Sequence, residues 1–257
     1  MKPNPETFRY PLVVLEETDS TNQYISQLCN DLKEDVAEFT TVAAEFQTSG
    51  KGQRGNSWEA EKGKNLLFSL VLYPTFLEAH HQFILSQIVS LAIKEELSRW
   101  SDDITIKWPN DIYWKEKKIC GILIENDLTG HHIGRSIAGI GININQEAFH
   151  SDAPNPVSLK QISGKEHDRH EILSHILRRI EIYYKGLQLE NFATYSAEIN
   201  ARYARSLFRR RGFHLYQDTG GQFLARLLRV ESDGRFVLED ENGQEREYLF
   251  KEVQHIL

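Results

Sequence analysis

The chain has 257 residues with a hydrophobic fraction of 40% and a charged fraction of 26%, which excludes bulk disorder and allows a sizeable core. The formal net charge of −7 argues against non-specific nucleic-acid binding as the main function. No apolar run approaches the roughly 20 residues that span a bilayer, the first residues carry no secretory signal, and the two cysteines are too few for a disulfide framework. We therefore expect a cytoplasmic protein without a membrane partner.

The first part of the chain is predicted to alternate between helices and strands. A helix should begin at Ser20, which can cap it, with Gln23 reaching back to complete a capping box. Residues 83–100 have the apolar spacing of an amphipathic helix. Five further apolar segments are predicted strands: 40–46, 66–73, 104–108, 119–124 and 136–144. The segment WPNDIYWKEKK, between the third and fourth of these strands, is predicted to be a charged connection with a turn.

The second part begins with a long helix. Asp168 is its predicted N-cap, Glu171 stands in the capping-box position, and one apolar face follows, formed by Ile172, Ile176, Ile180 and Tyr184. Four arginines further on, at positions 205, 209, 210 and 211, are predicted to be a solvated helix end, because cations suit a helix C-terminus.

After Gly212 the sequence changes from helical apolar spacing to short segments of alternating apolar and polar residues. Alternating segments are separated by Asp233-Gly234 and Asn242-Gly243, which are strong hairpin signals. We therefore predict an α+β body over residues 1–211 and a small all-β domain over residues 212–257.

A glycine-rich segment, GKGQRG at residues 50–55, satisfies the spacing G-x-G-x-x-G. The dinucleotide-binding motif requires a helix to open within it, whereas here a strand follows, so that reading is disfavoured. The Walker pattern and the downstream kinase motifs are absent from the sequence. We therefore predict that this segment is an anion-binding loop between two strands. Its glycines lack side chains, so the backbone can approach an anion closely, and Lys51 and Arg54 add positive charge.

A second group of residues surrounds two predicted strands. Pro109 ends the first strand, because proline lacks a ladder donor, and Asn110-Asp111 follow. Lys118 begins the next strand, where its ammonium can meet a carboxylate or a phosphate. The later segment GIGIN places glycines in a strand, which either opens space for a ligand or marks a bulge.

Four motifs in this order resemble the catalytic domain of biotin protein ligases, the biotin–[acetyl-CoA-carboxylase] ligases. They are STN, EFQTSGKGQRGNSW, KWPNDIYWKEKKICGILIE and GIGININ, between about Leu15 and Asn145. The resemblance implies a catalytic domain like that of class II aminoacyl-tRNA synthetases and a small C-terminal SH3-like β-barrel. It also implies a two-step reaction, in which biotin and Mg-ATP give biotinyl-5′-AMP and the adenylate then acylates a lysine of a biotin carboxyl carrier protein.

The resemblance also implies site residues, position by position. Biotin-binding residues are Ser20, Thr21, Asn22, Gln47, Lys51, Gly52, Gln53, Lys118 and Gly121. Nucleotide-binding residues are Arg54, Asn56, Trp58, Lys107, Asn110 and Asn143. Catalytic residues are Lys118, Arg54 and Lys51, of which Lys51 stands where the family usually has arginine. No metal ligands are assigned.

Two departures from the family pattern are visible. Many members carry arginine where this chain has Gln53, which puts in doubt how tightly the loop retains the adenylate. The ligase pattern begins almost at residue 10, which leaves no room for a DNA-binding winged helix, so we expect the monofunctional type and no DNA partner. A homodimer stays open, as does the role of the C-terminal domain, which could grip the carrier, close over ATP or stabilise the body.

Three functions are compatible with a site that binds an acid and a nucleotide. A biotin ligase agrees with all four motifs. A ligase of the same fold for lipoate or another carboxylic acid is the main alternative, and the KWPND segment and the glycine-rich loop disfavour it. A non-enzymatic sensor of biotin or nucleotide is disfavoured because the cations Lys118, Arg54 and Lys107 are retained.

Overall fold

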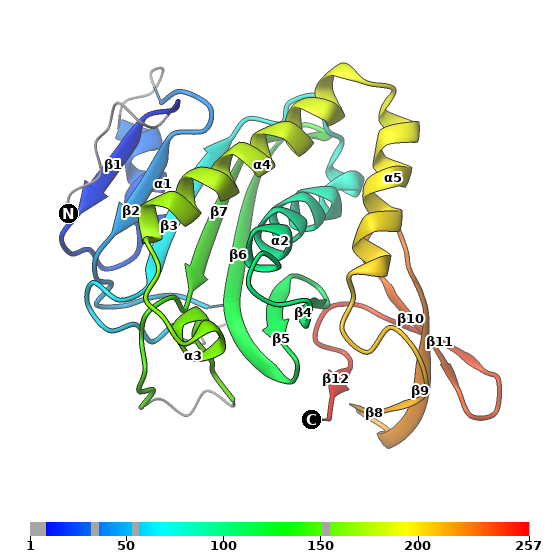
Figure 1. Ribbon diagram of the computed structural model, residues 1–257. Helices are drawn as coiled ribbons and strands as arrows, with labels where there is room; N and C mark the ends of the chain where they lie inside the picture. Colours follow the sequence, from blue (N-terminus) through cyan, green and yellow to red (C-terminus); the bar gives the residue numbers. More distant parts are fainter. Residues whose placement is uncertain (1–8, 32–35, 53–56, 151–154, 257) are drawn as a thin grey trace.

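A computed structural model describes residues 9–31, 36–52, 57–150 and 155–256 (Figure 1). Its centre is a seven-stranded sheet in the order β1-β2-β3-β7-β6-β5-β4. The strands are β1 (Leu12–Leu15), β2 (Thr41–Ala44), β3 (Leu66–Leu72), β4 (Ile104–Lys107), β5 (Asp111–Trp114), β6 (Lys117–Thr129) and β7 (His132–Ile142). β1 and β2 run parallel, and all the other neighbours are antiparallel.

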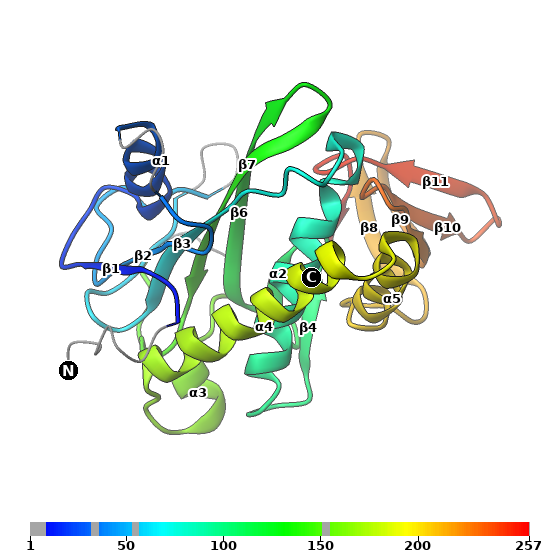
Figure 2. The same cartoon turned by 90° about the horizontal axis from the view of Figure 1, so that it is seen from above.

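Helices cover both faces of this sheet, which explains why every residue of β3 is buried (Figure 2). α1 (Thr21–Asp31) packs on one face, where Ile25 meets Val42, Val71 and Ile137. The other face carries α2 (Phe83–Leu97) and, outside it, α4 (Arg169–Leu189). No helix in the described residues is both long and apolar enough to cross a bilayer.

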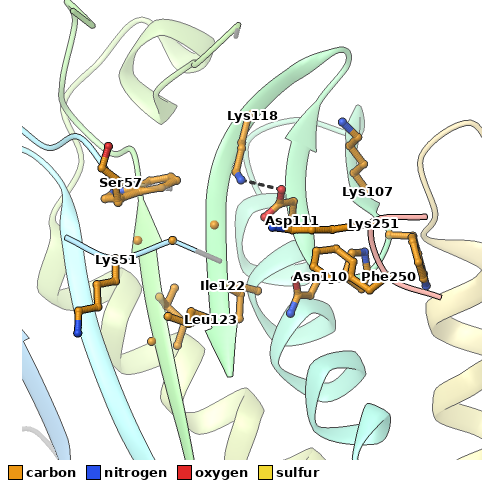
Figure 3. A pocket seen from close by; sticks show the side chains of 18 of the residues that line it. Lys51, Ser57, Lys107, Asn110, Asp111, Lys118, Ile122, Leu123, Phe250 and Lys251 are labelled. Carbon is orange, nitrogen blue, oxygen red and sulfur yellow. Dashed lines mark hydrogen bonds and ion pairs between the residues drawn. The ribbon is translucent and has the colours of Figure 1, made fainter. Parts of the chain in front are cut away.

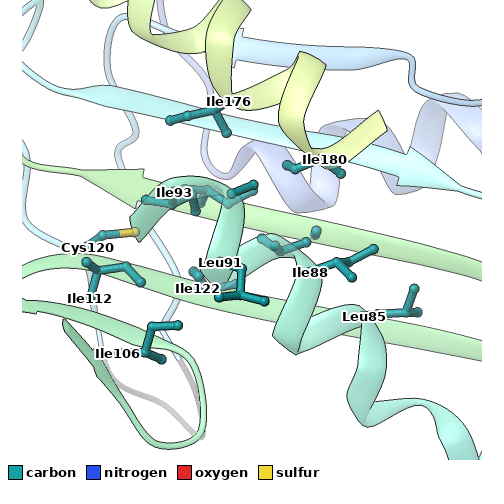
Figure 4. Packing of buried hydrophobic residues seen from close by; sticks show 14 of the residues in the cluster. Leu85, Ile88, Leu91, Ile93, Ile106, Ile112, Cys120, Ile122, Ile176 and Ile180 are labelled. Carbon is teal, nitrogen blue, oxygen red and sulfur yellow. The ribbon is translucent and has the colours of Figure 1, made fainter. Parts of the chain in front are cut away.

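The larger core lies between the sheet and α2. Leucine and isoleucine side chains of α2 interdigitate with those of β4, β5, β6 and α4 (Figure 4). Cys120 is fully buried in this cluster, and burial raises the pKa of its thiol. Cys120 therefore serves as a small apolar core residue and not as a reactive thiol, as is usual for a free cysteine inside a protein.

The predicted helix ends are partly confirmed. Asp168 caps α4 through hydrogen bonds from the backbone N–H groups of His170 and Glu171 at 2.8 and 3.2 Å, and the predicted apolar face of this helix is buried. In α1 the groups of the predicted capping box have other partners. Gln23 accepts a bond from Lys51, and the N–H of Thr21 donates to Gln47 instead, so a residue from outside the helix satisfies its first turn.

We expect Asp168→Ala to lower the free energy of unfolding by about 1 kcal/mol, because two N–H groups of the first turn of α4 lose their acceptor. Urea denaturation of the two proteins measures this difference. Asp168→Asn keeps a side-chain oxygen and should retain most of the stability. An equal loss in both variants would show that the bonds to the backbone contribute little.

The interpretation of WPNDIYWKEKK as a simple connection is wrong. Asp111–Trp114 forms β5, a full member of the sheet between β4 and β6. The charged sequence ends in a tight turn at Lys115 and Glu116, where Lys115 has a φ of 52°. Only Ile112 and Tyr113 of the strand are buried, and so short an apolar signal does not separate a strand from a loop.

The last part of the chain begins with α5 (Phe192–Arg205), after the short α3 (Leu159–Ser163) and α4. A five-stranded antiparallel sheet follows, in the order β11-β10-β9-β8-β12. Its strands are β8 (His214–Asp218), β9 (Gly221–Val230), β10 (Phe236–Asp240), β11 (Glu245–Tyr248) and β12 (Gln254–His255). Both predicted hairpins are therefore confirmed, with Gly234 and Gly243 at positive φ.

The small sheet is joined to the body by a continuous core. Trp108 of the body stacks on Phe236 at 4.9 Å between ring centres, and its indole N–H donates to the carbonyl of Gly234 at 2.9 Å. β11 and β12 are the two edges of the sheet in the described residues, so the closed SH3-like barrel stays a prediction. The domain boundary at residue 212 also stays a prediction.

Candidate active site

A cavity of about 720 Å³ lies where the central sheet meets the C-terminal segment (Figure 3). One end is formed by the start of α1 and by Gln47, and the middle by β6, β7 and the indole of Trp58. The other end is formed by residues 107–111, Tyr113 and the stretch from Phe250 to Ile256. Strands far apart in the sequence thus supply one continuous wall.

The end near α1 carries neutral polar side chains in a fixed network. Gln47 Oε1 accepts from the N–H and the hydroxyl of Thr21, at 2.7 and 3.0 Å. Ser69 Oγ lies 2.6 Å from Asn22 Oδ1, and Asn22 Nδ2 donates to Glu125 at 2.7 Å. Because these partners hold their side chains in place, this end can recognise a neutral polar group without first ordering itself.

Glycines of β6 and β7 make room for the side chains of Trp58 and Asn22. A Cβ on Gly121 would lie 2.8 Å from the Trp58 ring, and one on Gly141 would lie 2.6 Å from it. A Cβ on Gly139 would lie 2.1 Å from Asn22 Oδ1. β3 and β7 pair in regular register through Gly139 and Gly141, so the alternative of a bulge there is wrong. The glycines are required by close approach.

Lys118 lines the middle of the cavity and is the second residue of β6, just after the turn from β5. Its Nζ donates to Asp111 Oδ2 at 2.6 Å and lies 5.8 Å from the centre of the Trp58 ring (Figure 3). The side chains of Lys118 and Asp111 are half-buried, so a ligand can reach the ammonium. Asp111 thereby orients a cation toward the space that a substrate would fill.

The opposite end carries the ammonium group of Lys107. Lys107 donates to the hydroxyl of Tyr113 at 3.2 Å. Burial lowers the pKa of Lys107 below the ordinary lysine value, Asp111 opposes this effect, and Lys118 and Arg209 add to it. Burial, with the nearby cations Lys107 and Arg209, lowers the pKa of His255 to about 3, so this imidazole is neutral at ordinary pH.

Most of the predicted site residues lie together on this wall. They are Ser20, Thr21, Asn22, Gln47, Lys51, Gly52, Trp58, Lys107, Asn110, Lys118 and Gly121. Asn143 does not belong to the lining. It is buried, and its amide donates to the carbonyl of Val157 at 3.2 Å. The predicted residues Gln53, Arg54 and Asn56 lie outside the described residues, so their assignments stay predictions.

Sequence reasoning missed two parts of the wall. Asp111 stands in the KWPND motif seven residues before Lys118, and its pairing with that lysine could have been inferred had β5 been recognised. The C-terminal residues Phe250, Val253, Gln254 and Ile256 carry no motif. They reach the cavity only because the small sheet packs on Trp108.

This arrangement suits a ligand that is polar and neutral at one end and anionic near its reacting centre. Cations and a fixed carboxylate at the middle of the cavity can stabilise charge that develops during acyl or phosphoryl transfer. The charged groups of this wall suit a ligase-type site, which joins two substrates.

Comparison with known proteins also indicates a ligase. Residues 14–143 match the sequence profile of the Biotin/lipoate A/B protein ligase family, and the chain belongs to this family. The bifunctional ligase/repressor BirA of Bacillus subtilis is 30% identical over 246 residues, which cover 92% of this chain and 72% of that protein. A biotin–[acetyl-CoA-carboxylase] ligase of Paracoccus denitrificans is 29% identical, over 90% of this chain and 91% of that one.

The fold has a solved counterpart. The biotin protein ligase of Aquifex aeolicus, in complex with biotin and ATP, superposes with a TM-score of 0.76. The two sequences are 28% identical, and the match covers 96% of this chain and 99% of the other. The similarity therefore includes the C-terminal sheet as well as the region that matches the family profile.

Proposed function

We propose that this protein activates biotin with ATP as biotinyl-5′-AMP and transfers the biotinyl group to a lysine of a biotin carboxyl carrier protein. The observation that carries the proposal is the cavity wall itself. Neutral polar groups around Thr21 and Gln47 lie at one end, and the ammonium groups of Lys118 and Lys107 lie toward the other. This order of polarity matches a neutral ureido ring, a carboxylate and a triphosphate in line.

In the first step, a carboxylate oxygen of biotin attacks the α-phosphorus of ATP, and the bond to the pyrophosphate oxygen breaks. Negative charge gathers on the phosphoryl oxygens, and we assign Lys118 to stabilise it. Asp111 holds that ammonium in place at 2.6 Å, so little reorganisation is needed when the charge develops. We assign Lys51, at the glycine-rich loop, and Lys107 to the anionic parts of the substrates.

In the second step, the amine of the acceptor lysine attacks the acyl carbon of the adenylate, loses a proton, and AMP leaves. The acceptor is proposed to be a biotin carboxyl carrier domain. The family model includes lipoate as well as biotin ligases, and the named relatives in the comparisons are biotin ligases, so biotin is the favoured acid. No DNA binding and a cytoplasmic location stay predictions.

The magnesium ion is proposed to arrive with ATP as part of the substrate. Mg²⁺ is commonly held by one or two carboxylates together with substrate phosphates. In the part of the chain that the structure describes, no three His, Cys, Asp or Glu side chains form a cluster suited to a metal.

One assay tests the proposed function. Pyrophosphate release from ATP is measured with biotin, with lipoate, or with neither acid. We expect release with biotin alone, followed by incorporation of biotin into a carrier domain. Release with lipoate in preference to biotin would support the alternative ligase, and tight binding of biotin without release would support a sensor.

We expect the rate of adenylation at subsaturating ATP to fall at alkaline pH, below the ordinary lysine pKa of about 10.4. Burial makes Lys107 lose its proton earlier than an exposed lysine does, and the neutral amine no longer attracts phosphate. The loss should be roughly tenfold or more, the usual worth of a charge-assisted bond.

Lys107→Arg should move this alkaline limb to higher pH, because a guanidinium stays charged throughout the range. Lys115→Arg, at the exposed turn of the same hairpin, is the control and should leave the profile unchanged. An identical limb in the wild type and Lys107→Arg would remove Lys107 from nucleotide binding.

A further inference from the structure

The segment after α5 is fixed to the edge of the central sheet. The N–H of Ile106 in β4 donates to the carbonyl of Ser206, and the N–H of Phe208 donates back to Ile106, both at 2.8 Å. Leu207 and Phe208 are buried. Arg209 follows in the left-handed region, at a φ of 53°, where a residue other than glycine is uncommon. This backbone turn directs Arg209 away from the exposed Arg211.

Arg209 differs from the solvated helix end that the sequence predicts. Its side chain is only 13% exposed, and it bridges two separate elements. One terminal nitrogen donates to the backbone carbonyl of Ile256, just after β12, at 2.6 Å. The other donates to the carboxylate of Glu116, at the turn between β5 and β6, at 3.0 Å.

Both partners of Arg209 lead directly to the cavity. Ile256 belongs to the C-terminal part of the cavity wall. Glu116 lies two residues before Lys118, and its carbonyl accepts a short hydrogen bond from the amide of Asn155. The carbonyl of Asn155 accepts from the N–H of Lys118 at 3.0 Å. One guanidinium therefore links the last strand to the hairpin that carries Lys118, and Figure 1 shows these segments side by side.

We infer that Arg209 is a positioning residue that holds the C-terminal segment against the Lys118 hairpin and so sets the geometry of the nucleotide end of the cavity. This inference rests on the proposed function. A planar guanidinium suits the task, because its fork reaches two acceptors in fixed directions and an ammonium does not. The charge of Arg209 is also felt at the site, since it lowers the pKa of both Lys107 and His255.

The test is the steady-state and single-turnover release of pyrophosphate by Arg209→Gln, with biotin and ATP varied separately. We expect the KM for ATP to rise by about tenfold to a hundredfold, because a misplacement of about 1 Å can cost an enzyme up to about a hundredfold. The dissociation constant of biotin should change less than twofold, because the α1 end of the cavity makes no contact with Arg209 in the described residues. A merely structural role would lower the melting temperature without this difference between the two substrates.

Arg209→Lys separates geometry from charge. It keeps the positive charge and loses the two-pronged bond, so we expect the raised KM for ATP to persist. The exposed Arg211→Gln is the matched control and should behave as wild type. Wild-type kinetics in Arg209→Gln, equal losses for biotin and ATP, or full recovery in Arg209→Lys would each overturn the inference. If the wild type itself releases no pyrophosphate with biotin, the proposed function fails instead.

Discussion

Replacing Lys118 by alanine should slow biotinyl-adenylate formation by about 10²–10³-fold, the usual effect of losing one preorganised group that stabilises transition-state charge. The half-buried ammonium of Lys118 lies 2.6 Å from Asp111 and faces the cavity. The negative charge that faces Lys118 is greater in the transition state, where the phosphoryl oxygens are added to the biotin carboxylate, than in the complex with biotin alone. The rate should therefore fall more than the affinity for biotin does.

Single-turnover pyrophosphate release at saturating biotin and ATP measures this effect. Lys117→Ala is the matched control, because Lys117 is the exposed neighbour on the same strand. It should keep the wild-type rate. An unchanged single-turnover rate in Lys118→Ala would remove this residue from the chemistry, and a loss confined to biotin affinity would reduce it to a binding residue.

Trp108→Ala should lower the free energy of unfolding by about 3–5 kcal/mol, the usual cost of truncating a buried tryptophan. The ring lies between the body and the small sheet, stacked on Phe236 and edge-on to Phe250 at 5.8 Å. Its removal would leave a cavity at the joint and deprive the carbonyl of Gly234 of its donor.

Urea denaturation followed by circular dichroism measures the loss. Trp108→Phe keeps one six-membered aromatic ring and loses the pyrrole part of the indole with its N–H, so it should cost less than Trp108→Ala, about 1–3 kcal/mol. Trp114→Ala, in the partly exposed Trp114 of β5, should cost less than Trp108→Ala because less apolar surface is buried there. Equal losses at Trp108 and Trp114 would show that the joint is not a major part of the core.

The chain pattern alone determined most of the elements. The strand corresponding to β3, the long helix after Asp168, and both hairpins of the small sheet were predicted, because apolar periodicity and turn residues act over a few neighbouring positions. The resemblance of four motifs to those of biotin protein ligases placed Thr21, Gln47 and Lys118 among the candidate site residues, and these three lie on one cavity wall.

Tertiary structure decided what those local patterns could not. β5 is a strand because it pairs with β4 and β6 on its two sides, although its own sequence is short and charged. Asn143, which its motif predicts to bind nucleotide, donates its side-chain amide to the carbonyl of Val157, so its position is set by a loop that follows it in the chain; its role stays a prediction. In each case the outcome depends on partners that are distant in the sequence.

The C-terminal half of the cavity shows the same limit. Nothing in the residues from Phe250 to Ile256 indicates a binding wall, and nothing in the run of arginines separates Arg209 from Arg211. The packing of Trp108 on the small sheet brings the last strand to the cavity, and the left-handed turn at Arg209 carries its guanidinium inward. Periodicity records which side of an element is apolar, whereas the meeting of two elements depends on how the whole chain packs.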